Sequence, residues 1–142
     1  MKSLYRTQAL AQAGRNGEVH TQDGTLQLAL ALPTALGGNG QGNNPEQLLA
    51  AGYAACFSNA LLHVAKALDT PLASAPVATT VDLLARADGT FTFAILLEVT
   101  LSGELAEQIV RKAHQTCPFA NAMRGNVATR LLLNGQLLEE TK

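Results

Sequence analysis

The stretch that decides the fold is NPEQLLAAGYAACFSNALLHVAKAL, residues 44–68. It opens with a well-marked helix start, because Asn44 suits the N-cap, Pro45 the first helical position, and Gln47 can close a capping box. Glu46 in the first turn suits the positive end of the helix dipole. The remainder is mostly Ala, Leu, Gly and Phe and ends before an Asp-Thr-Pro stop. A helix that is apolar all round is a central one, so we expect this helix to be buried on every side.

Before this helix, the chain has the features of three strands and a loop. Strands are expected in residues 3–13, 18–22 and 25–32, because the last of these alternates leucine with other residues and Asp23-Gly24 favours a hairpin. The turn Gly-Arg-Asn-Gly separates the first two. Residues 36–44 form a glycine-rich connector or binding loop, which we expect to flex, and it lacks the Gly-Lys-Ser/Thr ending of a phosphate loop.

After the helix, residues 78–103 are expected to form a second hairpin that turns at Asp88-Gly89. Ser102 then suits the cap of a helix over residues 103–116, and residues 118–123 can form a short helical turn. Residues 126–135 make a final strand, followed by a polar tail. This order of elements predicts an α+β fold with segregated, mostly antiparallel strands around two longer helices.

The composition limits the class of protein. A chain of 142 residues with 47% hydrophobic side chains suits one globular domain, here residues 1–142. Only 15% of residues are charged, which indicates that apolar surface is hidden between subunits. The net charge of −1 comes without a basic cluster, so nucleic acid is not an expected partner. We see neither a signal peptide nor a membrane span of roughly 18 apolar residues, which predicts a cytoplasmic protein.

The two cysteines, Cys56 and Cys117, are either unrelated core residues or one chemical device. Free cysteine is common in protein cores, and a buried thiol is inert unless a cation is delivered to it. Cys117 precedes Pro118, so it would sit near the N-cap of a short helix, where backbone amides favour a thiolate. In the cytosol a cysteine pair is more often catalytic or redox-active than a structural disulfide.

The other polar residues have ordinary explanations when taken singly. Arg15 in the Gly-Arg-Asn-Gly turn would usually be solvated, and Glu46 would usually be a first-turn acid. The three histidines have no metal-ligand spacing with one another or with the cysteines, so no metal is expected. His63 is expected to be a core residue and His114 a charge at the end of its helix. His20 has no assigned role.

Two segments together closely resemble the organic hydroperoxide resistance proteins, the smaller branch of the OsmC-like superfamily. They are NPEQLLAAGYAACFSNAL (residues 44–61) and CPFANAMRGN (residues 117–126). The resemblance extends to the Gly-Arg-Asn-Gly turn, the glycine-rich loop and the chain length, and so covers almost the whole chain. Small departures at Ala54-Ala55 and Phe119-Ala120 touch no proposed catalytic group. The resemblance implies the OsmC-like fold and an intertwined homodimer.

The same resemblance implies a thiol peroxidase. Cys56 would attack an organic hydroperoxide and become a sulfenic acid, which Cys117 would resolve as a disulfide. Arg15 would activate the thiolate, and Glu46 would orient the arginine. No bound cofactor is implied; a lipoyl-type dithiol, free or on a lipoylated protein, would be the reducing co-substrate.

The side chains near the cysteines suggest the kind of substrate. Phe57, Phe119 and Met123, with nearby alanines and leucines, offer an apolar lining beside a polar centre. Such a lining suits a hydroperoxide with an alkyl, aryl or fatty-acyl tail better than hydrogen peroxide.

The spacing of Glu46 and Cys56 raises a question about subunits. In an uninterrupted helix the two lie about 15 Å apart along the axis, too far for one Arg15 to reach both easily. Either the chain curls back near Glu46, or the glutamate of one subunit serves the cysteine of the other, which we favour.

Three alternatives compete with a peroxidase of this branch. A non-catalytic ligand-binding or redox-sensing protein of the same fold would keep the apolar pocket, but it would not need both cysteines with Arg15 and Glu46. The longer OsmC branch is disfavoured by the length of 142 residues. A thioredoxin-type oxidoreductase is disfavoured because the chain has no Cys-x-x-Cys motif.

Overall fold

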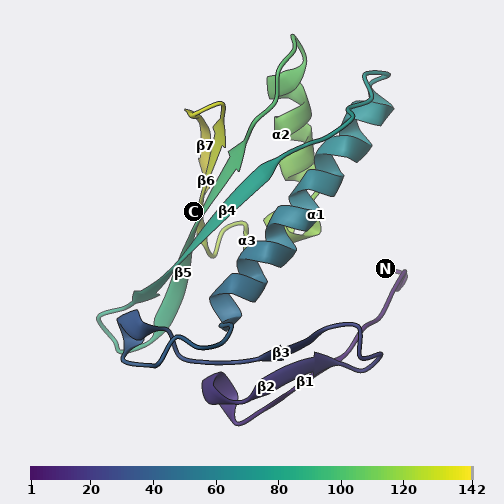
Figure 1. The fold of residues 1–142 in the computed structure, drawn as a ribbon. Helices are drawn as coiled ribbons and strands as arrows, with labels where there is room; N and C mark the ends of the chain where they lie inside the picture. The colour runs from purple at the N-terminus through teal and green to yellow at the C-terminus, as the bar shows by residue number, and fades with distance from the viewer. Residues whose placement is uncertain (142) are drawn as a thin grey trace. The chain divides into compact units, whose positions relative to one another are not determined.

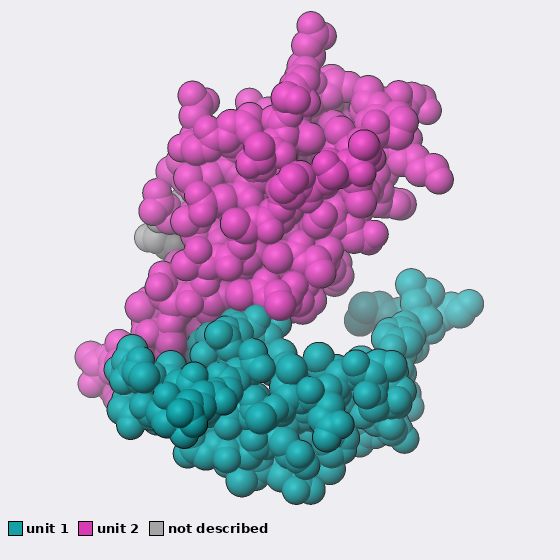
Figure 2. Space-filling view, viewed as in Figure 1, with its two compact units in different colours: residues 1–48 teal, residues 49–142 magenta. Residues whose placement is uncertain are grey.

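The computed structural model describes residues 1–141, and the side chains of residues 1–138. The chain forms two compact units, one of residues 1–48 and one from residue 49 onward (Figure 2). Helix α1 begins in the first unit and continues in the second. The expectation of a single domain stays a prediction.

Unit 1 contains a three-stranded antiparallel sheet in the order β1-β2-β3 (Figure 1). Its strands are β1 (Ala9–Gln12), β2 (Glu18–Thr21) and β3 (Gln27–Ala29). The β2–β3 hairpin turns at the expected Asp-Gly pair, where Gly24 has a φ of +72° and the Asp23 carboxylate accepts a hydrogen bond from the Thr25 amide. The hairpin prediction is confirmed, although β1 is shorter than expected and all its residues are exposed.

Two short 3-10 helices lie in the connections of this unit, one between β1 and β2 and one between β3 and α1. Helix η1 (Gly14–Asn16) carries Arg15, and η2 (Thr34–Leu36) precedes the glycine-rich loop. This loop is held against the chain after β3, because the Asn43 amide donates to the Ala29 carbonyl and the Ala31 amide to the Asn43 carbonyl, both at 2.9 Å. At Gly42 a Cβ would lie within 3.0 Å of that backbone, so the close pairing requires glycine there.

Helix α1 (Pro45–Ala67) begins with the predicted capping box. The Gln47 amide donates to the Asn44 side-chain oxygen at 2.9 Å, and the Asn44 amide donates to the Gln47 side-chain oxygen at 3.0 Å. The helix ends within one residue of the expected position. There Asp69 adopts a left-handed φ of +56°, and the Thr70 amide donates back to the Ala65 carbonyl.

The expectation that α1 is buried on every side is wrong for the single chain. Six of its side chains are buried: Tyr53, Phe57, Ala60, Leu61, Val64 and Ala65. The apolar residues Ala51, Ala55 and Leu62 are exposed instead. The reason is that the unit 2 core lies along only one face of the helix.

By length and composition alone, α1 could cross a membrane: it has 23 residues and a window of mean hydropathy 1.5. The core helix of a soluble protein meets the same criterion, and α1 packs one face into such a core. The expectation that the protein has no membrane partner stays a prediction.

Unit 2 contains a four-stranded sheet in the order β4-β5-β6-β7 (Figure 1). The strands are β4 (Val77–Ala85), β5 (Phe91–Val99), β6 (Ala128–Leu133) and β7 (Gln136–Thr141). The β4–β5 hairpin is confirmed, whereas β5 and β6 run parallel and are joined through two helices. The mostly antiparallel α+β prediction is therefore confirmed, with one parallel pair.

Strand β7 corrects the expected polar tail. The chain turns at Asn134 and Gly135, which have φ values of +50° and +81°, and returns as an antiparallel partner of β6. An Asn-Gly pair that adopts positive φ at both positions is a strong hairpin turn. The polar composition of residues 136–141 led us to expect a tail, although the Asn-Gly turn favours a strand there. Lys142 lies outside the described residues.

The second long helix, α2 (Ala106–Thr116), begins later than expected. Gly103 has a φ of +111°, which is incompatible with a helix, so Ser102 does not cap it and Leu105 stands at the N-cap. The short helix α3 (Pro118–Met123) is where the sequence predicted it. The core of unit 2 lies between α1, α2 and one face of the sheet, where Ile95, Leu97 and Val99 of β5 are buried.

Candidate functional site

The fold brings the two cysteines of unit 2 together. Cys56 lies in the middle of α1 and is partly exposed, whereas Cys117 joins α2 to α3 and is 0% exposed. The Cys117 thiol donates a hydrogen bond to the Cys56 sulfur over 3.7 Å. A disulfide requires about 2.05 Å, so both cysteines are free and close enough to join with a small shift.

The environment of Cys117 keeps its proton in place. Burial raises the pKa of its thiol above the ordinary value, and the hydrogen bond to Cys56 raises it further. Hydrogen bonds from the backbone amides of Ala120 and Phe119 lower the pKa of Cys117. They reach the thiol because Cys117 is the N-cap residue of α3 and Pro118 is the first residue of that helix, as predicted. The balance leaves Cys117 as a buried donor and Cys56 as the accessible acceptor.

Three aromatic rings and the two cysteines belong to the same core cluster or pack against it. The Tyr53 ring stacks on Phe119 with centroids 5.4 Å apart, and meets Phe57 edge to face at 6.4 Å. Of the predicted lining residues, Phe119 and Met123 are partly exposed, whereas Phe57 is 0% exposed and faces the core. Phe57 therefore offers no surface to a ligand in this chain.

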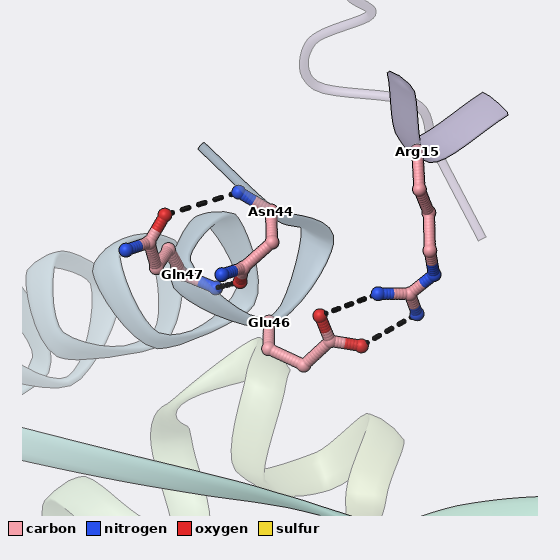
Figure 3. Close-up of polar contacts among 4 residues, drawn as sticks. All are labelled: Arg15, Asn44, Glu46 and Gln47. Atoms are coloured by element: carbon pink, nitrogen blue, oxygen red, sulfur yellow. Dashed lines mark hydrogen bonds and ion pairs between the residues drawn. The ribbon is translucent and has the colours of Figure 1, made fainter. Parts of the chain in front are cut away.

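A second pair of predicted residues lies within unit 1. The Arg15 guanidinium donates two hydrogen bonds to the Glu46 carboxylate, at 2.8 and 2.6 Å, in a bidentate ion pair (Figure 3). Arg15 stands on η1, and Glu46 lies in the first turn of α1, between the two capping-box residues Asn44 and Gln47 in the chain. The side chains are 35% and 14% exposed, so the arginine faces solvent while the carboxylate is largely covered.

Each member of this ion pair holds the other in its charged form. The hydrogen bond from Arg15 lowers the pKa of Glu46 below the ordinary value, against the opposing effect of burial. The same bond raises the pKa of Arg15. A guanidinium has five N–H donors and the carboxylate engages two of its nitrogens, so Arg15 retains donors for another ligand.

Two histidines differ from expectation. His63 is exposed rather than in the core, and His114, expected as a charge at the helix end, is 3% exposed with its ring 6.4 Å from that of Phe57. Among the described side chains, those of residues 1–138, no group of three or more His, Cys, Asp or Glu is placed to hold a metal ion.

Comparisons with known proteins identify the family of this chain. The family model for OsmC-like proteins matches residues 38–131. A Staphylococcus saprophyticus protein named organic hydroperoxide resistance protein-like 2 is 42% identical over 132 residues, which cover 89% of this chain and 93% of the relative. The chain belongs to the OsmC-like family, in its organic hydroperoxide resistance branch.

Solved structures of this branch share the fold. A Vibrio cholerae structure, described as a putative organic hydroperoxide resistance protein with captopril in one of its active sites, is 46% identical with a TM-score of 0.95, and the match covers 97% of each chain. OhrB of Bacillus subtilis is 38% identical with a TM-score of 0.83, over 93% of this chain and all of that one. The expected OsmC-like fold is confirmed.

The site contains one residue to which the sequence had given no role. Tyr53 precedes Cys56 by one helical turn, and its hydroxyl is buried without a hydrogen-bond partner among the described residues. The sequence did carry a signal, a tyrosine one helical turn before a cysteine in a mostly apolar helix. A hydroxyl buried at such a position normally has a hydrogen-bond partner.

Proposed function

We propose that this chain is a thiol peroxidase that reduces organic hydroperoxides to alcohols. The observation that carries the proposal is the pair of free thiols 3.7 Å apart, one accessible and one fully buried. Relatives at about 40% identity are named organic hydroperoxide resistance proteins, which supports a role in peroxide detoxification and the response to oxidative stress.

In the proposed first step the Cys56 thiolate attacks one oxygen of the peroxide. The S–O bond forms, the O–O bond breaks, and the other oxygen leaves as an alkoxide that takes a proton and becomes the alcohol. The hydrogen bond from Cys117 supports this step because it stabilises negative charge on the Cys56 sulfur.

In the second step Cys117 condenses with the Cys56 sulfenic acid. The S–S bond forms, the S–O bond breaks, and the oxygen leaves as water with the Cys117 proton. This removes the sulfenic acid before a second peroxide can over-oxidise it. A lipoyl-type dithiol then supplies two electrons by exchange, and closes its own ring as it leaves.

The Arg15–Glu46 pair supplies the positive charge in this proposal. A guanidinium never loses its proton in proteins and can donate to both a thiolate and a peroxide oxygen. Glu46, kept ionised by Arg15, would fix the orientation of that guanidinium. Both residues of the pair come from the same chain.

Apolar side chains would receive the organic tail. Phe119 and Met123, partly exposed beside the thiols, offer such a surface. Phe57 contributes to the core rather than to this surface, because it has no exposed area.

The proposed assembly is a cytoplasmic homodimer. Exposed apolar side chains support it, since a second copy could cover them. They are the exposed apolar residues of α1, Leu10 in β1, and Leu26 just before β3. The Cys56 of one chain would then meet the Arg15–Glu46 pair of the other.

A peroxidase assay tests the proposal. Wild type should reduce tert-butyl and fatty-acid hydroperoxides faster than hydrogen peroxide when dihydrolipoamide is supplied, and more slowly with a monothiol. Cys56→Ser should be inactive, and Cys117→Ser should lose turnover and over-oxidise at Cys56. A wild type indifferent to every peroxide would instead indicate a non-catalytic binding protein of the same fold.

A further inference from the structure

The Tyr53 hydroxyl is buried away from solvent and has no hydrogen-bond partner among the described protein atoms. Tyr53 is 0% exposed, and its ring stacks on Phe119 and meets Phe57 edge to face. Because the whole side chain is buried in these contacts, the hydroxyl does not reach solvent.

The surroundings of Tyr53 keep its phenol neutral. Burial raises the pKa of Tyr53 most strongly, and negative charge on Cys117 and, to a smaller extent, Cys56 raises it further. Arg124, whose guanidinium donates to the His114 carbonyl at 3.0 Å, acts in the opposite direction. The phenol therefore stays protonated at neutral pH and can act only as a neutral hydrogen-bond donor or acceptor.

A buried hydroxyl without a partner costs roughly 1–3 kcal/mol, so its retention needs a reason. Tyr53 lies one helical turn before Cys56 on α1, and its ring stacks on Phe119, two residues after Cys117. The proposed reaction adds one new acceptor at Cys56, the oxygen that its sulfur takes from the peroxide. Building on the proposed peroxidase function, we infer that the Tyr53 hydroxyl donates a hydrogen bond to that oxygen in the sulfenic acid and as it leaves.

The bond would act mainly on the disulfide-forming step. When Cys117 attacks the Cys56 sulfur, the S–O bond breaks and negative charge develops on the departing oxygen, which takes the Cys117 proton and leaves as water. A neutral donor aimed at this oxygen stabilises the charge, as a preorganised donor does in other active sites. Tyr53 keeps its own proton throughout, so the balance of atoms and electrons is unchanged.

The substitution Tyr53→Phe removes only the oxygen and keeps the aromatic packing. Thr79→Val is a matched control: the Thr79 hydroxyl, in β4 opposite Leu97, is the other buried unpartnered hydroxyl among the described residues. Both changes should leave stability unchanged or raise it, because each removes a polar group without a partner. Full-length variants are compared by urea unfolding.

The rate is then measured in a single turnover. One equivalent of tert-butyl hydroperoxide is added, the sulfenic acid is trapped with dimedone at successive times, and loss of free thiol reports the disulfide. Tyr53→Phe should slow disulfide formation about tenfold and increase over-oxidation of Cys56 in excess peroxide, the loss expected for one hydrogen bond. Thr79→Val should match wild type.

Two results would overturn the inference. If Tyr53→Phe forms its disulfide as fast as wild type, the hydroxyl does not assist the reaction. If it is slow but clearly less stable than wild type, the hydroxyl has a structural partner, for example in a second subunit. A wild type that reduces no peroxide would remove the proposed function itself, and so is distinguishable from either result.

Discussion

In unit 2, Cys117 is buried in the core and Cys56 is partly buried against it, whereas the Arg15–Glu46 pair of unit 1 stands partly in solvent. Around Cys117, burial opposes ionisation; around Glu46, a charge-assisted bond favours it. Apolar packing positions the sulfurs, and hydrogen bonds from a turn and a helix start position the charges. In the proposed mechanism this contrast is a division of labour, in which the thiol pair supplies the nucleophile and the ion pair supplies the activating cation.

The largest effect that would test this division is expected at Arg15. Arg15→Ala should slow the reaction of Cys56 with tert-butyl hydroperoxide about a hundredfold, because charge-assisted donors to the thiolate and the peroxide are lost. The Arg15→Lys variant keeps the positive charge but loses the planar guanidinium, so its rate should lie between those of wild type and Arg15→Ala. Stopped-flow measurement under single-turnover conditions gives the rates. If Arg15→Ala reacts at the wild-type rate, the Arg15–Glu46 pair does not activate Cys56.

Mixed dimers would show which chain supplies the cation. In the proposed mechanism Cys56→Ser is inactive, and Arg15→Ala is slowed about a hundredfold. If Arg15 serves the Cys56 of the other subunit, mixing the two variants regenerates one working site in each hybrid dimer, and activity rises after subunit exchange. If Arg15 serves its own chain, the mixture gains no activity over Arg15→Ala. Activity of the mixture against that of each variant alone decides the question.

A smaller effect is expected on the apolar side of the site. Met123→Ala should lower the preference for a fatty-acid hydroperoxide over hydrogen peroxide about tenfold, since contact area with the tail is lost. Leu137→Ala, which trims another exposed apolar side chain at 51% exposure, is the control and should leave the preference unchanged. The ratio of kcat/KM values for the two peroxides is the measurement, and an unchanged ratio in Met123→Ala would remove Met123 from the lining.

The helix start should matter for stability more than for chemistry. Asn44→Ala removes the side-chain acceptor for the Gln47 amide and should lower the free energy of unfolding by about 1 kcal/mol. Asn59→Ala, at an exposed position within the same helix, should be neutral or slightly stabilising. Urea unfolding of both variants checks the difference; equal stabilities would show that the capping box contributes little.

The smallest expected effect is on the free energy of unfolding at acidic pH. Because Arg15 lowers the pKa of Glu46, the ion pair stabilises the fold above the ordinary carboxyl pKa of 4.5, and this contribution is lost as pH falls through the lowered value. Wild type and Glu46→Gln should therefore differ in unfolding free energy near neutrality and converge in acid below that range. A difference independent of pH would mean that charge is not what Glu46 contributes.

The sequence predicted the elements whose signals are local. The capping box of Asn44 and Gln47, the Asp-Gly hairpins and the short helix after Pro118 all depend on nearest neighbours in the chain, and the structure has each of them. The start of α2 was misplaced because the left-handed backbone of Gly103 overrides the capping potential of Ser102. Strand β7 was missed because polar composition outweighed the Asn-Gly turn.

The site was predictable only in part. Both pairings, Cys56 with Cys117 and Arg15 with Glu46, connect distant positions, and the resemblance to a known family indicated them where spacing could not. The exposed face of α1 was not foreseen, because composition does not distinguish a helix buried by its own chain from one that a second copy would cover. Tyr53 escaped notice because its significance lies in a missing partner, which only coordinates reveal.

The most direct test of the central claim is the covalent state of the cysteines after one equivalent of organic hydroperoxide. We predict that the chain loses the mass of two hydrogen atoms, and that non-reducing peptide mapping finds one intramolecular bond between Cys56 and Cys117, which dihydrolipoamide reverses. Recovery of Cys56 as a sulfinic or sulfonic acid with Cys117 still free, or of a disulfide between two chains, would contradict the account.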